Sequence, residues 1–146
     1  FSRAELESRA EIKYEAYSKA MNIEARSMID IASKHIIPAV IRYVTSLADS
    51  INQVKQASSA ASIEVQEELL IQASVLLADT KKALKKLEDV MEEVAGKEVG
   101  KEQAFFFLRQ VVPAMENLRT PVDNLEMIVD SRIWPMPTYG DLLFNV

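Results

Sequence analysis

The side chains with catalytic potential are few in this sequence, and a single histidine, His35, stands first among them. A di-metal site in a helical protein uses a Glu-x-x-His pair on each of two helices, but the residue three positions before His35 is Ala32. Ser-His-Asp and Cys-His arrangements would also need this histidine as their base, and no Gly-x-Ser-x-Gly segment accompanies it. We therefore expect no catalytic residue and no metal ligand, and interpret His35 as a surface or half-buried side chain.

The segment 96–102, which reads GKEVGKE, has the residue types of a phosphate-binding loop but not their spacing. Such a loop needs four residues between its glycines and a Ser or Thr after the lysine, because backbone amides surround the phosphates and the hydroxyl binds magnesium. Here three residues separate Gly96 from Gly100, and Glu102 follows Lys101. We interpret the segment as a solvated turn between helices and expect no cofactor-binding residue in this chain.

An acidic cluster lies near the end of the second of the three helices that the sequence predicts, as described below, and consists of Glu88, Asp89, Glu92 and Glu93. The C-terminal end of a helix carries the negative pole of the helix dipole. A negative side chain there therefore destabilises the helix by up to ~1 kcal/mol. The cluster is either a docking face for a basic partner or a solvated face. Lysines between residues 81 and 86 precede it by one turn, which favours the solvated face.

The run Phe105 to Leu108 places three aromatic residues around more than half of a helix circumference. A single apolar stripe cannot account for all of them. Either this end of the domain is covered on two sides, or Phe106 or Phe107 contacts another chain, and we favour the first alternative.

The composition restricts the partners. With 22 acidic and 17 basic residues the formal charge is −5, and the basic residues are scattered, so nucleic acid is not expected. Cysteine is absent, which excludes thiolate chemistry and is consistent with a reducing cytoplasm. No stretch reaches the ~18 apolar residues of a membrane span, so we expect a cytoplasmic protein without a membrane partner. The chain begins at Phe1 and not at methionine, and we expect a piece of a longer polypeptide or a processed form.

Helices must position these residues, because the chain has only three glycines and its apolar residues recur in steps of three and four. A capping-box pattern from Ser2 to Glu5 begins the first segment. Pro38 interrupts it at a cost of ~3 kcal/mol unless neighbours compensate, so we expect a kink or a division into two helices. Unless it divides, this segment of ~55 residues is longer than its partners, and its N-terminal half projects and needs another surface to cover it. Its stripe consists of Leu6, Ala10, Tyr14, Tyr17, Met21, Ala25, Met28, Ala32, Ile36, Val40, Val44, Leu47, Ile51 and Val54.

Two further stripes predict two further helices. The small, polar segment 57–62 connects the first to the second, where Ser62 and an acidic first turn favour a helix start. Pro113 should kink the third helix, and Thr120 with Pro121 can break or bend it. The second stripe consists of Leu70, Ala73, Leu77, Thr80, Leu84, Leu87, Met91 and Val94, and the third of Leu108, Val111, Met115, Leu118, Val122, Leu125 and Val129.

Residues 134–146, WPMPTYGDLLFNV, hold the only tryptophan and one charged side chain, Asp141. Pro135 and Pro137 exclude the preceding residues from the helical region, so the helix must end by about Ile133. Large apolar side chains in a chain end are explained most simply by docking. We predict an all-α fold, an elongated antiparallel bundle of three long helices, or four if Pro38 splits the first, over residues 1–133, with an extended docking tail over residues 134–146. The predicted docking residues are Trp134, Pro135, Pro137, Tyr139, Leu142, Leu143 and Phe144.

Residues 125–146, LEMIVDSRIWPMPTYGDLLFNV, closely resemble the extreme C-terminus of type III glutamine synthetases. Residues 23–43, IEARSMIDIASKHIIPAVIRY, are similar to the first long helix of the same C-terminal region, and residues 111–119, VVPAMENLR, are similar to its last helix. The resemblance covers nearly the whole chain, although residues 50–104 are less distinctive. Pro121 departs from the smoothly helical segment expected in the family.

The resemblance implies a non-catalytic C-terminal domain of a larger enzyme that ligates ammonia to glutamate with ATP and magnesium. It implies as partners the enzyme's own upstream catalytic module and neighbouring subunits of a homo-oligomer, since the family forms dodecamers of two stacked hexameric rings. No motif of the catalytic module is present, so no catalytic, nucleotide or metal residue is carried over. The alternative is a freestanding helical adaptor that binds other proteins. A bundle enzyme with a carboxylate-bound metal is disfavoured by the single histidine.

Overall fold

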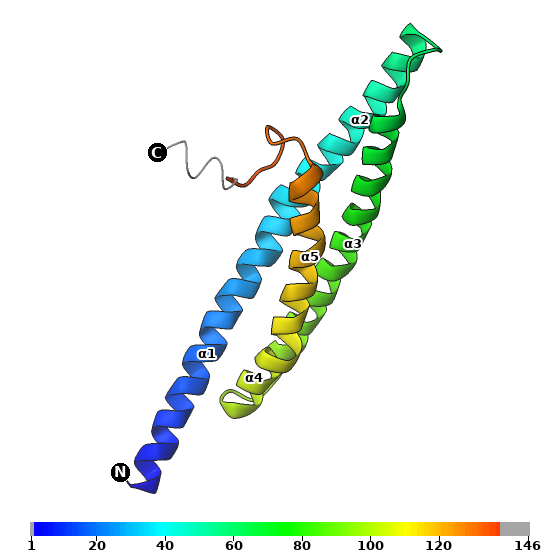
Figure 1. Cartoon of the computed structure of the whole chain (residues 1–146). Coiled ribbons are helices and arrows are strands. Elements are labelled where there is room, and N and C mark those ends of the chain that lie inside the picture. The colour runs from blue at the N-terminus through cyan, green and yellow to red at the C-terminus, as the bar shows by residue number, and fades with distance from the viewer. Residues whose placement is uncertain (1, 138–146) are drawn as a thin grey trace. The chain divides into compact units, whose positions relative to one another are not determined.

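The computed structural model describes residues 2–137, in which every regular element is a helix (Figure 1). The first helical run of 55 residues comprises α1, η1 and α2, α3 forms the second, and α4, η2 and α5 form the third. The predicted all-α fold of three long helices is therefore confirmed. The bounds are Arg3–Ile31 for α1, Ala32–Ile36 for η1, Ile37–Ala57 for α2, Glu64–Ala95 for α3, Lys101–Phe106 for α4, Phe107–Val111 for η2 and Val112–Ile128 for α5.

The helix starts and turns follow the predicted signals. The Ser2 hydroxyl accepts a 3.2 Å hydrogen bond from the Glu5 amide, which is the capping contact expected at the start of α1. Before α3, the Ser62 hydroxyl accepts a 3.3 Å hydrogen bond from the Glu64 amide. The segments predicted as connections, 57–62 and 96–102, contain the two turns that separate the three helical runs.

Both η1 and η2 are π-helical segments, and each ends two residues before a proline. Pro38 and Pro113 have no amide to donate to the carbonyl four residues earlier, and their rings crowd that carbonyl. A π-helical turn, with bonds to the fifth residue back, widens the helix at such a point without ending it. The first helical run is therefore continuous through Pro38. Pro121 lies inside α5, which continues to Ile128 without a break.

The described residues form two compact units. Unit 1 contains residues 2–31 and 83–119, and unit 2 contains residues 32–82 and 120–137. In unit 1, α1 packs against α4 and η2, while the last part of α3 runs antiparallel to them (Figure 1). Its largest buried side chains include Leu84, Leu87, Phe107, Val111 and Leu118. At its surface, Arg119 forms ion pairs with Glu24, at 2.8 Å, and with Glu116.

In unit 2, η1 and α2 pack with the first part of α3 and the end of α5. The buried apolar residues of this unit are Ala32, Ile36, Ala39, Val40, Tyr43, Leu47, Ala73, Leu125, Val129 and Trp134. Thr80 is a buried polar residue here, and its hydroxyl donates a 2.8 Å hydrogen bond to the Leu76 carbonyl. Because this hydroxyl has a hydrogen-bond partner, its burial does not carry the free-energy cost of a missing hydrogen bond.

The predicted stripes match the core to different degrees. Every residue of the second stripe is buried or half-buried. The third stripe is wrong at Leu108, which is 50% exposed, while Phe107 beside it is 2% exposed. The wider turn of η2 begins at Phe107, and it changes the angular phase that steps of three and four assume. In the first stripe, Leu6 is 55% exposed, whereas Tyr43, which lies outside the predicted stripe, is buried.

Candidate docking surface

The chain leaves α5 through a turn that brings Trp134 back to unit 2. The helix ends at Ile128, five residues before the predicted limit. The amides of Ile133 and Trp134 then donate hydrogen bonds of 2.9 and 3.0 Å to the Asp130 carbonyl. The Asp130 carboxylate accepts a 2.9 Å hydrogen bond from the Arg132 amide, which lowers the pKa of Asp130. These bonds define the path of the chain immediately before the predicted tail.

Trp134 is the one buried residue among the described residues of the predicted tail, 134–137. It is 7% exposed, and its indole Nε1 is buried without a hydrogen-bond partner within residues 2–137. An unpaired buried donor of this kind usually has a partner elsewhere, because leaving it unmet costs ~1–3 kcal/mol.

The seven predicted docking residues fall into three groups. Trp134 is buried against its own unit, and Pro135 and Pro137 are exposed after it. Tyr139, Leu142, Leu143 and Phe144 lie outside the described residues. The docking role of the seven residues therefore stays a prediction, with Trp134 as the residue that joins the tail to the domain.

Unit 1 carries a second apolar surface, the aromatic groove, which sequence periodicity did not identify. It has a volume of about 200 Å³ and is lined by Tyr14, Tyr17, Ala104, Phe105 and Leu108. The rings of Tyr14 and Phe105 lie 6.2 Å apart between centroids, with 49° between their planes. This tilted arrangement is a favourable one for an aromatic pair. The only sequence signal for this groove was the excess of aromatic residues between Phe105 and Leu108.

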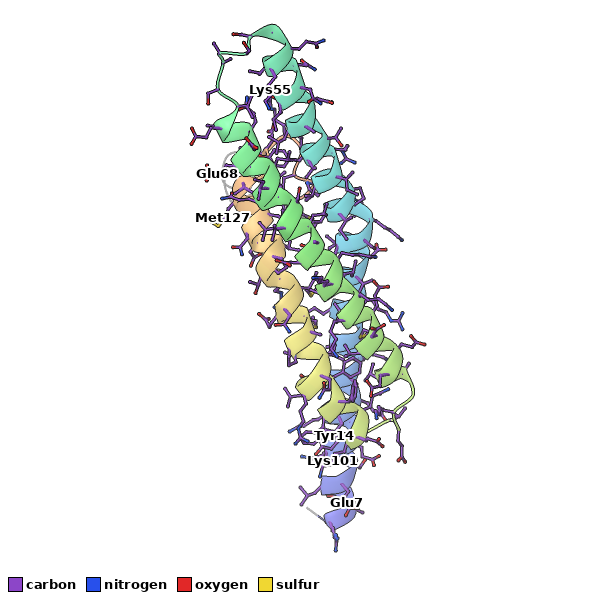
Figure 2. The ribbon with its side chains drawn as sticks, turned by 90° about the vertical axis from the view of Figure 1, so that its right-hand side faces the viewer. Glu7, Tyr14, Lys55, Glu68, Lys101 and Met127 are labelled. Atoms are coloured by element: carbon purple, nitrogen blue, oxygen red, sulfur yellow. The ribbon has the colours of Figure 1, made fainter. Side chains whose placement is uncertain are left out.

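Two cationic side chains lie over the Phe105 ring, next to the aromatic groove but not among the residues that line it. The Lys101 ammonium lies 5.8 Å from the centroid of the Phe105 ring, and the Arg109 guanidinium carbon lies 4.9 Å from it. Figure 2 shows Tyr14 and Lys101 close together at the same end of unit 1. The Lys97 ammonium lies 5.1 Å from the Phe106 ring. Lys97, Lys101 and Arg109 line, together with Glu102, a separate pocket that shares Phe105 with the groove.

These contacts address the two alternatives for the three phenylalanines. Phe107 is in the core of unit 1, and Phe105 and Phe106 are half-buried on different sides of the same helical run. Phe107 is thus covered by its own chain. Phe105 and Leu108 keep exposed surface in the aromatic groove, and the choice between a second covered side and a contact of Phe106 with another chain stays a prediction.

The other residues considered for chemistry lie at the surface. His35 is exposed, and within residues 2–137 no group of three or more His, Asp or Glu side chains is arranged to hold a metal ion. The acidic residues 88, 89, 92 and 93 are exposed. Asp89 accepts a 2.7 Å hydrogen bond from Lys85, which raises the pKa of Lys85. None of the described helices is long and apolar enough to cross a membrane.

Comparison with known proteins gives a consistent picture. Residues 1–55 match the family model described as the glutamine synthetase C-terminal domain. The chain is 32% identical to a glutamine synthetase of Bacteroides fragilis over 99% of its length, and 31% identical to a type-3 glutamine synthetase of Dictyostelium discoideum over 98% of its length. A glutamine synthetase of Butyrivibrio fibrisolvens is 28% identical over the whole chain.

The chain spans about a fifth of the length of these curated relatives, at 20% of the first two and 21% of the third. The similarity nevertheless extends over nearly all of this chain, including the less distinctive middle. The chain therefore belongs to the family of glutamine synthetase C-terminal domains, of the type found in type-3 glutamine synthetase.

Proposed function

We propose that this chain is a structural and assembly domain of a glutamine synthetase and contributes no catalytic residue. It docks on the catalytic module of the same polypeptide and on neighbouring subunits of a homo-oligomer. The observation that carries the proposal is the exposed aromatic groove of unit 1. Leu108 is 50% exposed there beside the half-buried rings of Tyr14, Tyr17 and Phe105, and apolar side chains that stay accessible side by side are typical of contact surfaces.

The size of the relatives supports the catalytic module as the occupant of the aromatic groove. About four-fifths of each relative lies outside the part that this chain matches. The groove residues Tyr14 and Tyr17 lie on α1, ~17 and ~21 Å from its first residue at 1.5 Å per residue. In a C-terminal domain, the preceding module joins at this end of α1, so the groove is within its reach.

The charges beside the groove specify the surface that fits it. Lys101 and Arg109 lie over the Phe105 ring beside the groove, so a matching surface has an apolar centre and acidic side chains on that one side. We expect the module's contact surface to carry Asp or Glu opposite these two residues.

The enzymatic reaction belongs to the rest of the polypeptide under this proposal. The parent activity is the ATP-dependent ligation of ammonia to glutamate, with ATP and magnesium bound in the catalytic module. The residues from Ser2 to Pro137 offer no carboxylate or histidine cluster suited to a metal ion, so no step of that reaction is assigned to them.

A charge placed in the aromatic groove tests the proposal in the full-length enzyme. Leu108→Asp puts a carboxylate on a side chain that is 50% exposed, so it should disrupt docking without unfolding the domain. Ile12→Asp is the matched control, because Ile12 is 63% exposed and lies ~200° around α1 from Tyr14. Light scattering should show a smaller assembly for Leu108→Asp only. Normal assembly and activity of Leu108→Asp would contradict docking through this groove.

Two truncations test the tail separately. Ending the full-length enzyme after Ile133 removes Trp134 together with the rest of the tail, whereas ending it after Pro137 keeps the buried tryptophan. We expect both truncations to weaken assembly, and only the first to lower the stability of the domain itself. If the second truncation leaves ring assembly, stability and activity unchanged, residues 138–146 have no docking role.

A further inference from the structure

The outer face of α3 in unit 2 carries two large apolar side chains that do not contribute to the core. Ile71 is 60% exposed and Val75 is 55% exposed. They are four residues apart, so they are neighbours on one side of the helix. Each is two residues from the buried Ala73, which places each ~160° around the helix from it. The pair therefore faces away from the core of unit 2.

Two oppositely charged side chains lie on this face at equal distances from Val75. Glu68 precedes Val75 by seven residues and Lys82 follows it by seven, which is two helical turns, or ~10.5 Å, in each direction. Both side chains are exposed, and neither forms an ion pair within residues 2–137. In the sequence, Glu64 and Lys86 repeat the same symmetry eleven residues on either side of Val75. We call Glu68, Ile71, Val75 and Lys82 the α3 stripe.

The order of charges in the α3 stripe is complementary to its own reverse. When two copies of α3 pack antiparallel about a two-fold axis beside Val75, Glu68 of each copy lies opposite Lys82 of the other. Ile71 of each copy then lies at the level of the small side chain of Ala78. A parallel pair would instead place Glu68 against Glu68 and Lys82 against Lys82, which is repulsive. The charges therefore select a second copy of this chain in the antiparallel orientation.

We propose that the α3 stripe is a self-association surface, at which two copies of this chain meet antiparallel about Val75. The inference rests on the proposed function in one respect, because it names a surface for the contact between neighbouring subunits. It uses neither the aromatic groove nor the tail. It is tested on the chain without a catalytic module, so its failure would leave docking through the aromatic groove unaffected.

The contact is small for a dimer that stands alone. From Glu68 to Lys82, α3 is ~21 Å long, and a helix with side chains is ~10 Å wide, so about 200 Å² of each copy faces the other in projection. A stable interface buries about 800 Å² per partner. We therefore expect the isolated chain to associate weakly, with a dissociation constant of about 0.1–1 mM. The contact gains strength where other contacts already hold two copies together.

Disulfide formation measures this contact directly, because the chain contains no cysteine. Val75→Cys places one thiol beside the two-fold axis, where two copies bring their sulfurs within bonding range. Val65→Cys is the matched control, since Val65 is also a valine of α3 and is 68% exposed, but lies ~80° around the helix from Val75. Under mild oxidation of about 0.1 mM chain, Val75→Cys should form disulfide dimers at least about tenfold faster than Val65→Cys. Equal rates for the two variants would overturn the proposal.

Charge reversal tests the antiparallel orientation in the Val75→Cys chain. Glu68→Lys or Lys82→Glu alone places like charges opposite each other at two places in the pair, so crosslinking should slow about tenfold. Mixing the two variants restores both opposite-charge pairs in the mixed dimer. The mixed disulfide should therefore form about as fast as that of Val75→Cys alone, and ion-exchange chromatography separates it from the two like dimers by charge. A statistical distribution of the three dimers, or no recovery on mixing, would contradict the antiparallel contact.

Discussion

The hydroxyl of Tyr43 on α2 donates a 2.9 Å hydrogen bond to the carbonyl oxygen of Ile128, the last residue of α5. The final carbonyls of a helix have no donor within the helix, so Tyr43 satisfies one of them from a neighbouring helix. The turn to Trp134 begins directly after this point, and Trp134 is buried in the same unit. The bond therefore holds the end of α5 in the position from which the tail departs.

Replacing Tyr43 by Phe should lower the free energy of unfolding by about 0.5–1.5 kcal/mol, because the ring stays buried while the hydrogen bond is lost. Urea unfolding followed by the fluorescence of Trp134, the only tryptophan, measures this loss. Acrylamide should also quench Trp134 more strongly in the variant. Tyr17→Phe is the control, since the Tyr17 hydroxyl has no hydrogen bond within the described residues. Equal stability of Tyr43→Phe and the unchanged chain would mean that the bond contributes nothing.

The same hydroxyl predicts a loss of stability at alkaline pH. Burial, and secondarily the negative charge of Asp130, raise the pKa of Tyr43 above its ordinary value of 10.0. A raised pKa means that the folded state keeps its proton when the unfolded state loses it. The contribution is complete below pH 10.0 and disappears as the pH rises through the folded-state pKa. The difference in unfolding free energy between the unchanged chain and Tyr43→Phe should therefore shrink above this pH, and a constant difference would contradict it.

The second helix could be predicted from the sequence almost completely, because apolar residues that recur in unbroken steps of three and four are typical of an α-helix packed on one side. The same spacing wrongly predicts a buried side chain at Leu108, because the π-helical segment η2 has a wider turn than an α-helix. A signal was present in the sequence: both π-helical segments end two residues before a proline, Pro38 or Pro113. A proline indicates that a helix is disturbed there, but it does not say whether the chain kinks, breaks or widens.

The surfaces were harder to predict than the helices, since they depend on contacts between distant segments. Tyr14 and Phe105 form one aromatic pair, yet periodicity treats each only as a member of its own helix. Ser18 reads as a surface residue in any hydropathy pattern, although it is buried. The importance of Trp134, in contrast, follows from composition, because the prolines on its C-terminal side keep this large apolar ring out of a helix.

Shortening a core leucine of unit 1 should cost far more than shortening an exposed one in the same helical run. Leu118 is 1% exposed and Leu108 is 50% exposed. Leu118→Ala removes buried methyl groups and leaves a cavity, so it should lower the free energy of unfolding by about 2–5 kcal/mol. Leu108→Ala should change it by less than about 1 kcal/mol. Urea unfolding of both variants provides the comparison, and similar losses would contradict the buried position assigned to Leu118.

The two glycines of the turn between α3 and α4 should respond to alanine in opposite directions. Gly100 has a φ of +115°, a backbone conformation that side chains strongly disfavour, and a Cβ placed there meets nothing within 4 Å. A side chain at this position is therefore disfavoured by the backbone conformation alone. Gly100→Ala should lower the free energy of unfolding by about 1–3 kcal/mol.

At Gly96 the φ is not in this region, and an added Cβ would lie 3.5 Å from the Glu93 carbonyl oxygen, an ordinary contact. Gly96→Ala should leave stability unchanged or raise it by up to about 1 kcal/mol, because alanine restricts the unfolded chain. Urea unfolding of the two variants in parallel checks both signs. If both alanines were tolerated equally, the turn would not require the left-handed backbone at Gly100. The turn before α4, which begins at the next residue, Lys101, would then have a different backbone conformation.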